Sequence, residues 1–122
     1  MPKHNFKELN VWKKSISLTE EIYLFTASLP NEEKFGLISQ MRRSAVSIPS
    51  NIAEGSGRDS DKEFSRFLDI SLSSAFELET QIIIAQKIFS VISEDLEKIN
   101  QILAEVQNMI YGLKKILNLN NK

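Results

Sequence analysis

Apolar residues recur every three or four positions over most of this chain, which is the spacing of amphipathic helices. The clearest run lies near the C-terminus, where steps of three and four alternate without a break. That run comprises Leu96, Ile99, Leu103, Val106, Ile110, Leu113 and Leu117. Such alternation is a heptad a/d seam, so it predicts a helix over 93–118, with Ser93 as its N-cap.

The N-terminal quarter has the same periodicity and predicts a helix over 8–29. Pro30 ends this helix, because the residue before a proline is pushed out of the α region. Asn31 is then the predicted N-cap of a second helix over 32–56, whose first turn contains favourable acidic residues.

The second helix is predicted to contain a proline and to end in glycines. Its apolar positions run from Phe35 to Ala53 at helical spacing. Pro49 removes a backbone donor and clashes with the preceding turn, so we expect a bend just before it. Gly55 and Gly57 then end the helix.

A third helix is predicted over 60–90. Ser60 and Glu63 stand at the spacing of a capping box and fix its start. The run Ile82–Ile84 has high β propensity, but helical spacing on both sides outweighs that local preference. The expected buried seam comprises Phe64, Phe67, Leu68, Ser71, Ala75, Leu78, Ile82, Ala85 and Phe89.

Four helices with short connections predict an all-α fold, an antiparallel up-down-up-down bundle that forms a single domain over 1–122. The 122 residues suffice for one core, and 42% hydrophobic and 25% charged residues are ordinary for a soluble protein. The N-terminus has no secretory h-region, and no apolar run approaches the roughly 20 residues needed to span a bilayer. We therefore expect a cytoplasmic protein with no membrane partner.

An additional apolar stripe widens the fourth helix beyond its seam. Ile102, Met109 and Ile116 recur every seven residues, and the first helix also has surplus apolar residues, including Trp12 and Tyr23. These five residues are a predicted homo-oligomer interface, because a cyclic head-to-tail assembly needs two different surfaces on each subunit. The alternative is a broad stripe that faces a single core.

Signals for catalysis are weak. The single histidine, His4, lies near the N-terminus, where we expect it to be exposed to solvent. The carboxylates Glu54, Asp69, Glu77 and Glu79 could suggest a di-iron bundle, but that site needs Glu-x-x-His pairs on two helices. There are no cysteines, so thiolate sites are excluded. We therefore predict no metal, no cofactor and no catalytic residues.

Arg42 and Arg43 lie beside the apolar face of the second helix. An arginine in such a place usually buries its stem and pairs with a carboxylate, for which Glu77 and Glu79 are the candidates. In the competing interpretation, the pair belongs to a basic patch for nucleic-acid phosphates or a partner protein. That candidate patch comprises Arg42, Arg43, Arg58, Lys62 and Arg66.

Three segments, Phe6–Leu18, Ile22–Arg58 and Lys62–Ala85, resemble the proteins encoded in intervening sequences of bacterial 23S ribosomal RNA genes. The specific part is the block from Glu33 to Arg58, with Phe64, Phe67, Leu68 and Glu77–Thr80 after it. The resemblance implies a left-handed up-down bundle, a homopentameric ring and no established enzymatic activity. A related branch, the accessory variability determinant of diversity-generating retroelements, is a basic pentamer that associates with a reverse transcriptase and RNA. This chain differs from that branch in its charge, because its formal net charge is −1.

Two classes of function follow. The first is a non-catalytic oligomeric scaffold that binds RNA or a protein, with a reverse-transcriptase accessory subunit as its alternative form. The second is an enzyme with a site at one end of the bundle. The residues available for such a site are Arg42, Arg43, Glu54, Glu77 and Glu79.

Overall fold

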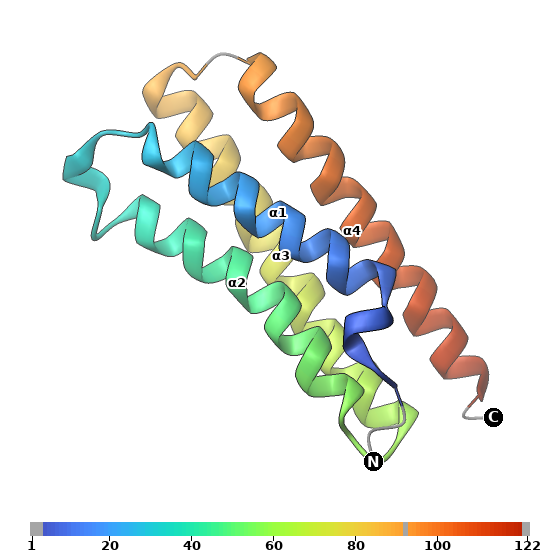
Figure 1. Cartoon of the computed structure of the whole chain (residues 1–122). Coiled ribbons are helices and arrows are strands. Elements are labelled where there is room, and N and C mark those ends of the chain that lie inside the picture. The colour runs from blue at the N-terminus through green and yellow to red at the C-terminus, as the bar shows by residue number, and fades with distance from the viewer. Residues whose placement is uncertain (1–3, 92, 121–122) are drawn as a thin grey trace.

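The computed structural model describes residues 4–91 and 93–120, with the backbone alone for 93, 95 and 120 (Figure 1). Every regular element in this part of the chain is helical, which confirms the all-α fold class with four long helices. The elements are η1 Phe6–Glu8, α1 Asn10–Ala27, η2 Asn31–Glu33, α2 Leu37–Ser56, α3 Asp61–Phe89 and α4 Ser93–Asn120.

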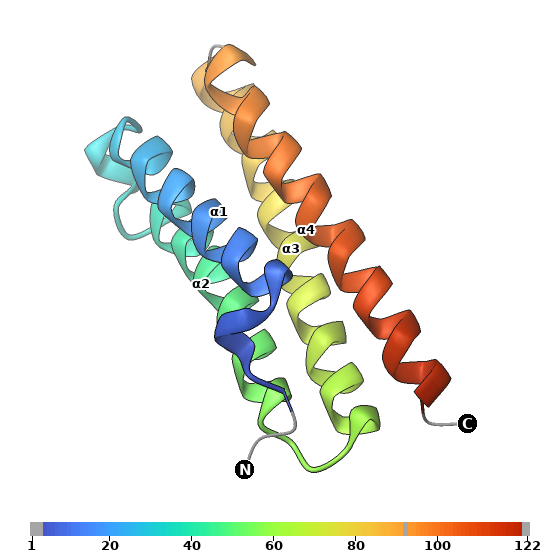
Figure 2. The ribbon, with the colours of Figure 1, turned by 45° about the vertical axis from the view of Figure 1, so that its right-hand side comes forward.

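Each long helix packs against the next one along the chain, and α4 returns to pack against α1 (Figures 1 and 2). Between α1 and α4, Lys14 pairs with Glu105 and Glu21 with Lys98, so residue numbers rise along one helix and fall along the other. The two helices are therefore antiparallel. The most extensive interface joins α2 and α3.

The core consists of the predicted apolar seams. Leu18 and Ile22 of α1, Met41 of α2 and Leu68 of α3 are fully buried. Six of the seven seam residues of α4 are buried, and Leu113 is half-buried against them. The periodicity of the sequence thus identified the faces that the helices bury.

The predicted start of the second helix was wrong. Residues 31–33 form the separate 3-10 helix η2, and α2 begins only at Leu37. Gly36 lies between them with φ −111° and ψ −111°, outside the helical region, so the backbone breaks there. Asn31 therefore does not cap α2, and Phe35, predicted to lie on its apolar face, is 90% exposed.

The start of the third helix is confirmed. The Ser60 hydroxyl accepts a hydrogen bond of 3.1 Å from the Glu63 backbone N–H, and α3 ends where Ser90 adopts a left-handed conformation at φ 50°.

The first helix is shorter than predicted, because η1 precedes α1 and Ser28 caps its end. The predicted cap at Ser93 depends on a side chain outside the described residues.

Gly55 has a different role from the predicted helix stop. It is buried inside the last turns of α2, and Gly57 is the C-cap. A Cβ atom added at Gly55 would lie 2.7 Å from Phe67 Cβ and 2.9 Å from Phe64 Cδ1. Gly55 is therefore needed because α2 and α3 approach each other too closely for any side chain.

We predict that Gly55→Ala lowers the free energy of unfolding by about 1–3 kcal/mol, because the new methyl group forces α2 and α3 apart. Gly57→Ala is the matched control, since its Cβ would meet nothing closer than 3.7 Å and its φ of −90° suits any residue. Urea denaturation of both variants measures the difference. Equal stabilities would contradict the close-approach argument.

Pro49 lies in the middle of α2, and the helix continues through it. In a regular helix, the backbone N–H of residue 49 donates a hydrogen bond to the carbonyl oxygen of Ala45. Proline has no N–H, so the Ala45 carbonyl lacks this donor. The Thr19 hydroxyl of α1 lies 3.2 Å from the Ala45 oxygen and 2.8 Å from the Ser15 oxygen. Thr19 can therefore supply the donor that Pro49 lacks; the bend in α2 stays a prediction.

We predict that Thr19→Val lowers the free energy of unfolding by about 1 kcal/mol, the usual net value of one hydrogen bond. The cost should shrink in a Pro49→Ala background, where the restored N–H of residue 49 can reach Ala45. A double-mutant cycle read by thermal unfolding measures this coupling. A cost of the same size in both backgrounds would mean that Thr19 does not serve the Ala45 carbonyl.

Candidate binding surfaces

The structure divides the candidate basic patch into two parts. Arg42 and Arg43 lie near the start of α2, whereas Arg58 and Arg66 lie at the α2–α3 turn. The 16 residues from Arg42 to Arg58 correspond to about 24 Å of chain at the helical rise of about 1.5 Å per residue. A single patch of five cations is therefore not formed within one chain.

At the α2–α3 turn the arginines are already paired. Arg58 donates to Glu54 at 2.9 Å and Arg66 to Glu63 at 3.0 Å, and both guanidinium groups lie over the Phe67 ring. The hydrogen bond from Arg66 lowers the pKa of Glu63 below its ordinary value. These carboxylates reduce the positive charge that this end of the bundle offers to a phosphate.

Arg42 does not form the predicted ion pair within the described part of the chain. Its Nε donates to Thr26 Oγ1 at 2.8 Å, and its guanidinium lies 4.5 Å from the centre of the Tyr23 ring. The reason is the helix face: Arg42 points from α2 toward α1, while Glu77 and Glu79 belong to α3. Glu79 instead accepts from Gln107 of α4 at 2.8 Å. Pairing across a subunit interface stays a prediction.

A basic groove lies beside Arg42, and it combines the predicted patch residues Arg42 and Arg43 with residues that the sequence did not indicate. We call it the Phe35 groove; its volume is about 440 Å³. It is lined by Tyr23, Lys34, Phe35, Ile38, Ser39, Arg42, Arg43 and Val46. It combines three cations with two aromatic rings, and no carboxylate lines it.

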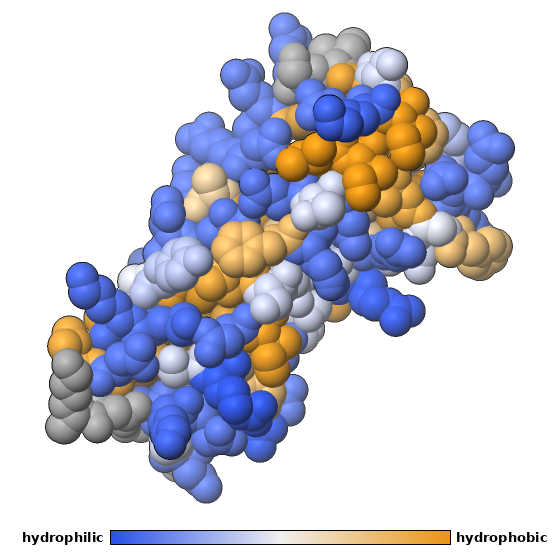
Figure 3. Space-filling view, turned by 180° about the vertical axis from the view of Figure 1, so that it is seen from behind, coloured by the Kyte–Doolittle hydropathy of each residue, from blue (hydrophilic) through white to orange (hydrophobic). Residues whose placement is uncertain are grey.

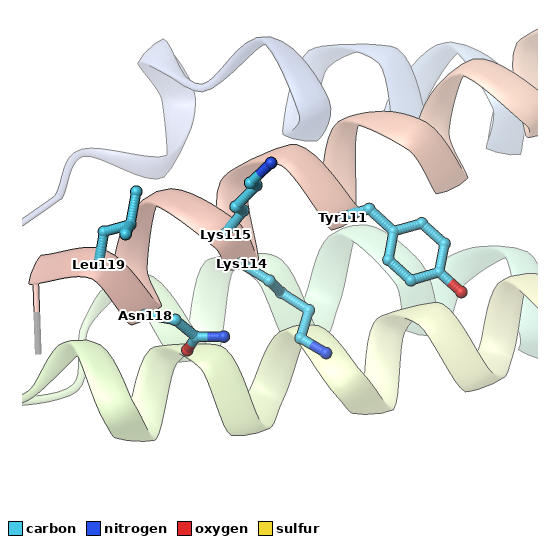
Figure 4. A pocket seen from close by; sticks show the side chains of 5 residues that line it. All are labelled: Tyr111, Lys114, Lys115, Asn118 and Leu119. Atoms are coloured by element: carbon cyan, nitrogen blue, oxygen red, sulfur yellow. The ribbon is translucent and has the colours of Figure 1, made fainter. Parts of the chain in front are cut away.

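The end of α4 has a shallow depression of about 520 Å³ (Figure 4). Its five lining residues all come from α4, and their side chains point in different directions, with Lys115 directed away from Lys114. Lys114 is paired with Asp69 of α3. These side chains do not converge on one point, so they do not define a site.

A large apolar area lies on α3, toward its C-terminal end (Figure 3). Five large hydrophobic side chains on the solvent side of this helix are 39–64% exposed. They are Ile70, Phe76, Ile83, Ile84 and Ile88. The predicted interface lay elsewhere: Trp12, Ile102 and Met109 pack against the subunit's own core, and only Tyr23 and Ile116 are strongly exposed.

The residues proposed for an enzyme site do not come together. Glu54 pairs with Arg58 at one end of α2, and Arg42 lies about three turns away against α1.

The prediction that His4 is exposed to solvent was wrong. The centre of its ring lies 5.1 Å from the centre of the Phe64 ring, and its Nε2 lies 3.4 Å from Asp61 Oδ1. Within residues 4–91 and 93–120, no group of His, Asp or Glu is arranged to hold a metal.

No described helix combines the length and the apolarity that crossing a bilayer requires.

These features define a four-helix protein with exposed apolar and cationic surfaces. The profile of the 23S rRNA-intervening sequence proteins matches residues 7–112, so the chain belongs to that family. It is also similar to a solved structure from Bacteroides thetaiotaomicron VPI-5482, described as a protein with unknown function from the S23 ribosomal protein family. The two share 29% identity and a TM-score of 0.79, over 86% of this chain and 98% of that one. No curated protein matches the chain.

We predict different effects on stability for the two adjacent arginines. Arg42→Ala should lower the free energy of unfolding by about 1–2 kcal/mol, because it removes a charged hydrogen bond to the buried Thr26 and a cation–π contact. Arg43→Ala should change it by less than about 0.5 kcal/mol, as expected for an exposed residue. Chemical denaturation of both variants tests the assignment. A larger loss for Arg43→Ala would contradict it.

Proposed function

We propose that this protein is a non-catalytic homo-oligomeric scaffold of the cytoplasm. Its subunit is a left-handed up-down-up-down bundle, and its assembly is the pentamer that the sequence resemblance implies. The observation that supports this proposal is a set of three exposed isoleucines toward the C-terminal end of α3, which we call the α3 row: Ile83, Ile84 and Ile88 are 46%, 40% and 64% exposed. Contiguous apolar surfaces of this kind mark interaction sites, since their burial stabilises an assembly.

A closed ring of identical subunits needs two different complementary surfaces on each subunit. The α3 row supplies one. For the other we propose the region of Ile116 on α4, a predicted interface residue that remains 57% exposed. Tyr23 lies at the other end of the α1–α4 pair, since Glu21 pairs with Lys98, and is not part of this surface. Ile102 and Met109 pack against the core of their own subunit, so we do not include them in the proposed contact.

The alternative functions have less support. Of the proposed enzyme residues, Arg42 contacts α1, Glu54 pairs with Arg58 and Glu79 contacts Gln107 of α4, so these three do not face one site. The accessory subunits that the chain resembles are basic overall, whereas this chain has a formal net charge of −1 and its arginines at the α2–α3 turn are paired. The scaffold is therefore the function that the exposed surfaces support best.

We predict that the wild-type protein sediments as a homo-oligomer at micromolar concentration and that Ile84→Glu with Ile88→Glu dissociates it. Two carboxylates in a buried apolar contact carry a large desolvation cost, while the helix itself should persist because both positions are exposed. Sedimentation equilibrium gives the mass, and circular dichroism checks the helicity.

Leu24→Glu is the matched control for this experiment. Leu24 is 69% exposed on α1, away from the α3 row, so its substitution should leave the mass unchanged. A wild-type monomer would refute the scaffold proposal. An oligomer that survives the double substitution would show that α3 is not part of the contact.

A further inference from the structure

The Phe35 groove brings three cations together beside two aromatic rings, and none of the three has a carboxylate partner among the described residues. Single cations without an ion pair occur elsewhere on the described surface, at Lys7, Lys13, Lys62, Lys87 and Lys115, but they do not line this groove. Elsewhere, Lys14, Arg58, Arg66, Lys98 and Lys114 each form an ion pair. Among the described residues, no carboxylate pairs with Lys34, Arg42 or Arg43. The lining of the groove therefore carries three positive charges and no negative one, and the nearest acidic residues in the chain are Glu32 and Glu33, just before Lys34.

The aromatic residues of the groove are placed beside this charge. Phe35 is 90% exposed on the turn before α2, and Lys34 Nζ lies 5.6 Å from the centre of its ring. Tyr23, from α1, is 43% exposed and lies under the guanidinium of Arg42. An aromatic ring that projects almost fully into solvent contributes little to its own fold, but it offers a flat face on which another planar group can stack.

The positions of the cations are fixed to different degrees. Arg42 is held by Thr26 Oγ1 and by the Tyr23 ring, with one terminal nitrogen 3.4 Å from the Tyr23 carbonyl oxygen. Arg43 is exposed. The groove thus has one anchored guanidinium and two cations free to adjust to a ligand, Arg43 and Lys34.

We infer that the Phe35 groove binds single-stranded nucleic acid, with a base stacked on Phe35 and neighbouring phosphates held by Lys34, Arg42 and Arg43. Aromatic side chains for stacking together with cations along the backbone are the combination by which proteins bind single strands. Complementary charge selects a polyanion, and the exposed ring selects an unpaired base over the closed stack of a duplex. This inference goes beyond the proposed scaffold, because the groove is complete within one chain.

The test is fluorescence anisotropy with the full-length protein and a labelled oligouridylate of about 12 nucleotides, a length within known single-strand site sizes. Three phosphate contacts predict a slope of about −2 for log K against log salt. The affinity should therefore fall roughly twentyfold between about 50 and 200 mM salt. A single-stranded DNA of the same length should compete, and a duplex should compete more weakly.

Two variants separate the two kinds of contact. Phe35→Ala should weaken binding by about 5- to 100-fold with the same salt slope, because it removes stacking and no charge. Arg43→Gln should make the slope shallower by about 0.7. Arg58→Gln is the matched control: its guanidinium is paired with Glu54 at the other end of α2, so affinity and slope should stay unchanged.

Several outcomes would overturn the inference. They are no binding in low salt, binding that Phe35→Ala and Arg43→Gln leave unchanged, and displacement of the RNA by poly-glutamate as readily as by DNA. The mass of Phe35→Ala in sedimentation distinguishes this inference from the scaffold proposal. If that variant dissociates, the groove is an interface between copies of the chain and the nucleic-acid site is refuted. If the wild type is a monomer that still binds the oligonucleotide, only the scaffold proposal fails.

Discussion

The close approach of α2 and α3 is the constraint on which the rest of the bundle depends. It is set by Gly55, where no side chain fits against Phe64 and Phe67. Further along the interface, small hydroxyl residues continue the contact. The hydroxyl oxygens of Ser47 and Ser74 lie 2.8 Å apart and share a hydrogen bond, and the Ser71 hydroxyl donates to the Ile48 carbonyl oxygen at 2.7 Å. Because this pair of helices is so tightly fitted, α1 and α4 pack against a rigid surface with little freedom to shift.

The helices and the core could be predicted from the sequence, because periodic apolar residues determine which face of a helix is buried. The α4 seam and the Ser60 cap show this directly. Positions where two elements meet were less predictable. Gly55 has the sequence appearance of a helix end, and only the position of α3 shows that it is a packing site. In the same way, the N-terminal break of α2 depends on the conformation of Gly36, which periodicity does not encode.

The candidate surfaces were harder to predict than the core. Arg42 and Glu79 belong to neighbouring helices, yet the relative rotation of α2 and α3 turns them toward different partners. The stripe on α4 was expected to be surplus, but Ile102 and Met109 pack against the core beside α1 residues, and only Ile116 stays strongly exposed. The Phe35 groove combines residues from α1, the turn after η2 and the start of α2. Such a combination has no spacing in the sequence and becomes visible only when the elements are placed together.

The unequal interfaces of the bundle have a consequence for how the chain acquires its structure. The helices α2 and α3 are joined by only four residues, 57–60, and share the most extensive contact. Closing such a short loop costs little conformational entropy, so this hairpin can form before the more distant α1 and α4 meet. We therefore expect substitutions at the α2–α3 interface to slow the folding rate, whereas substitutions between α1 and α4 should mainly speed unfolding.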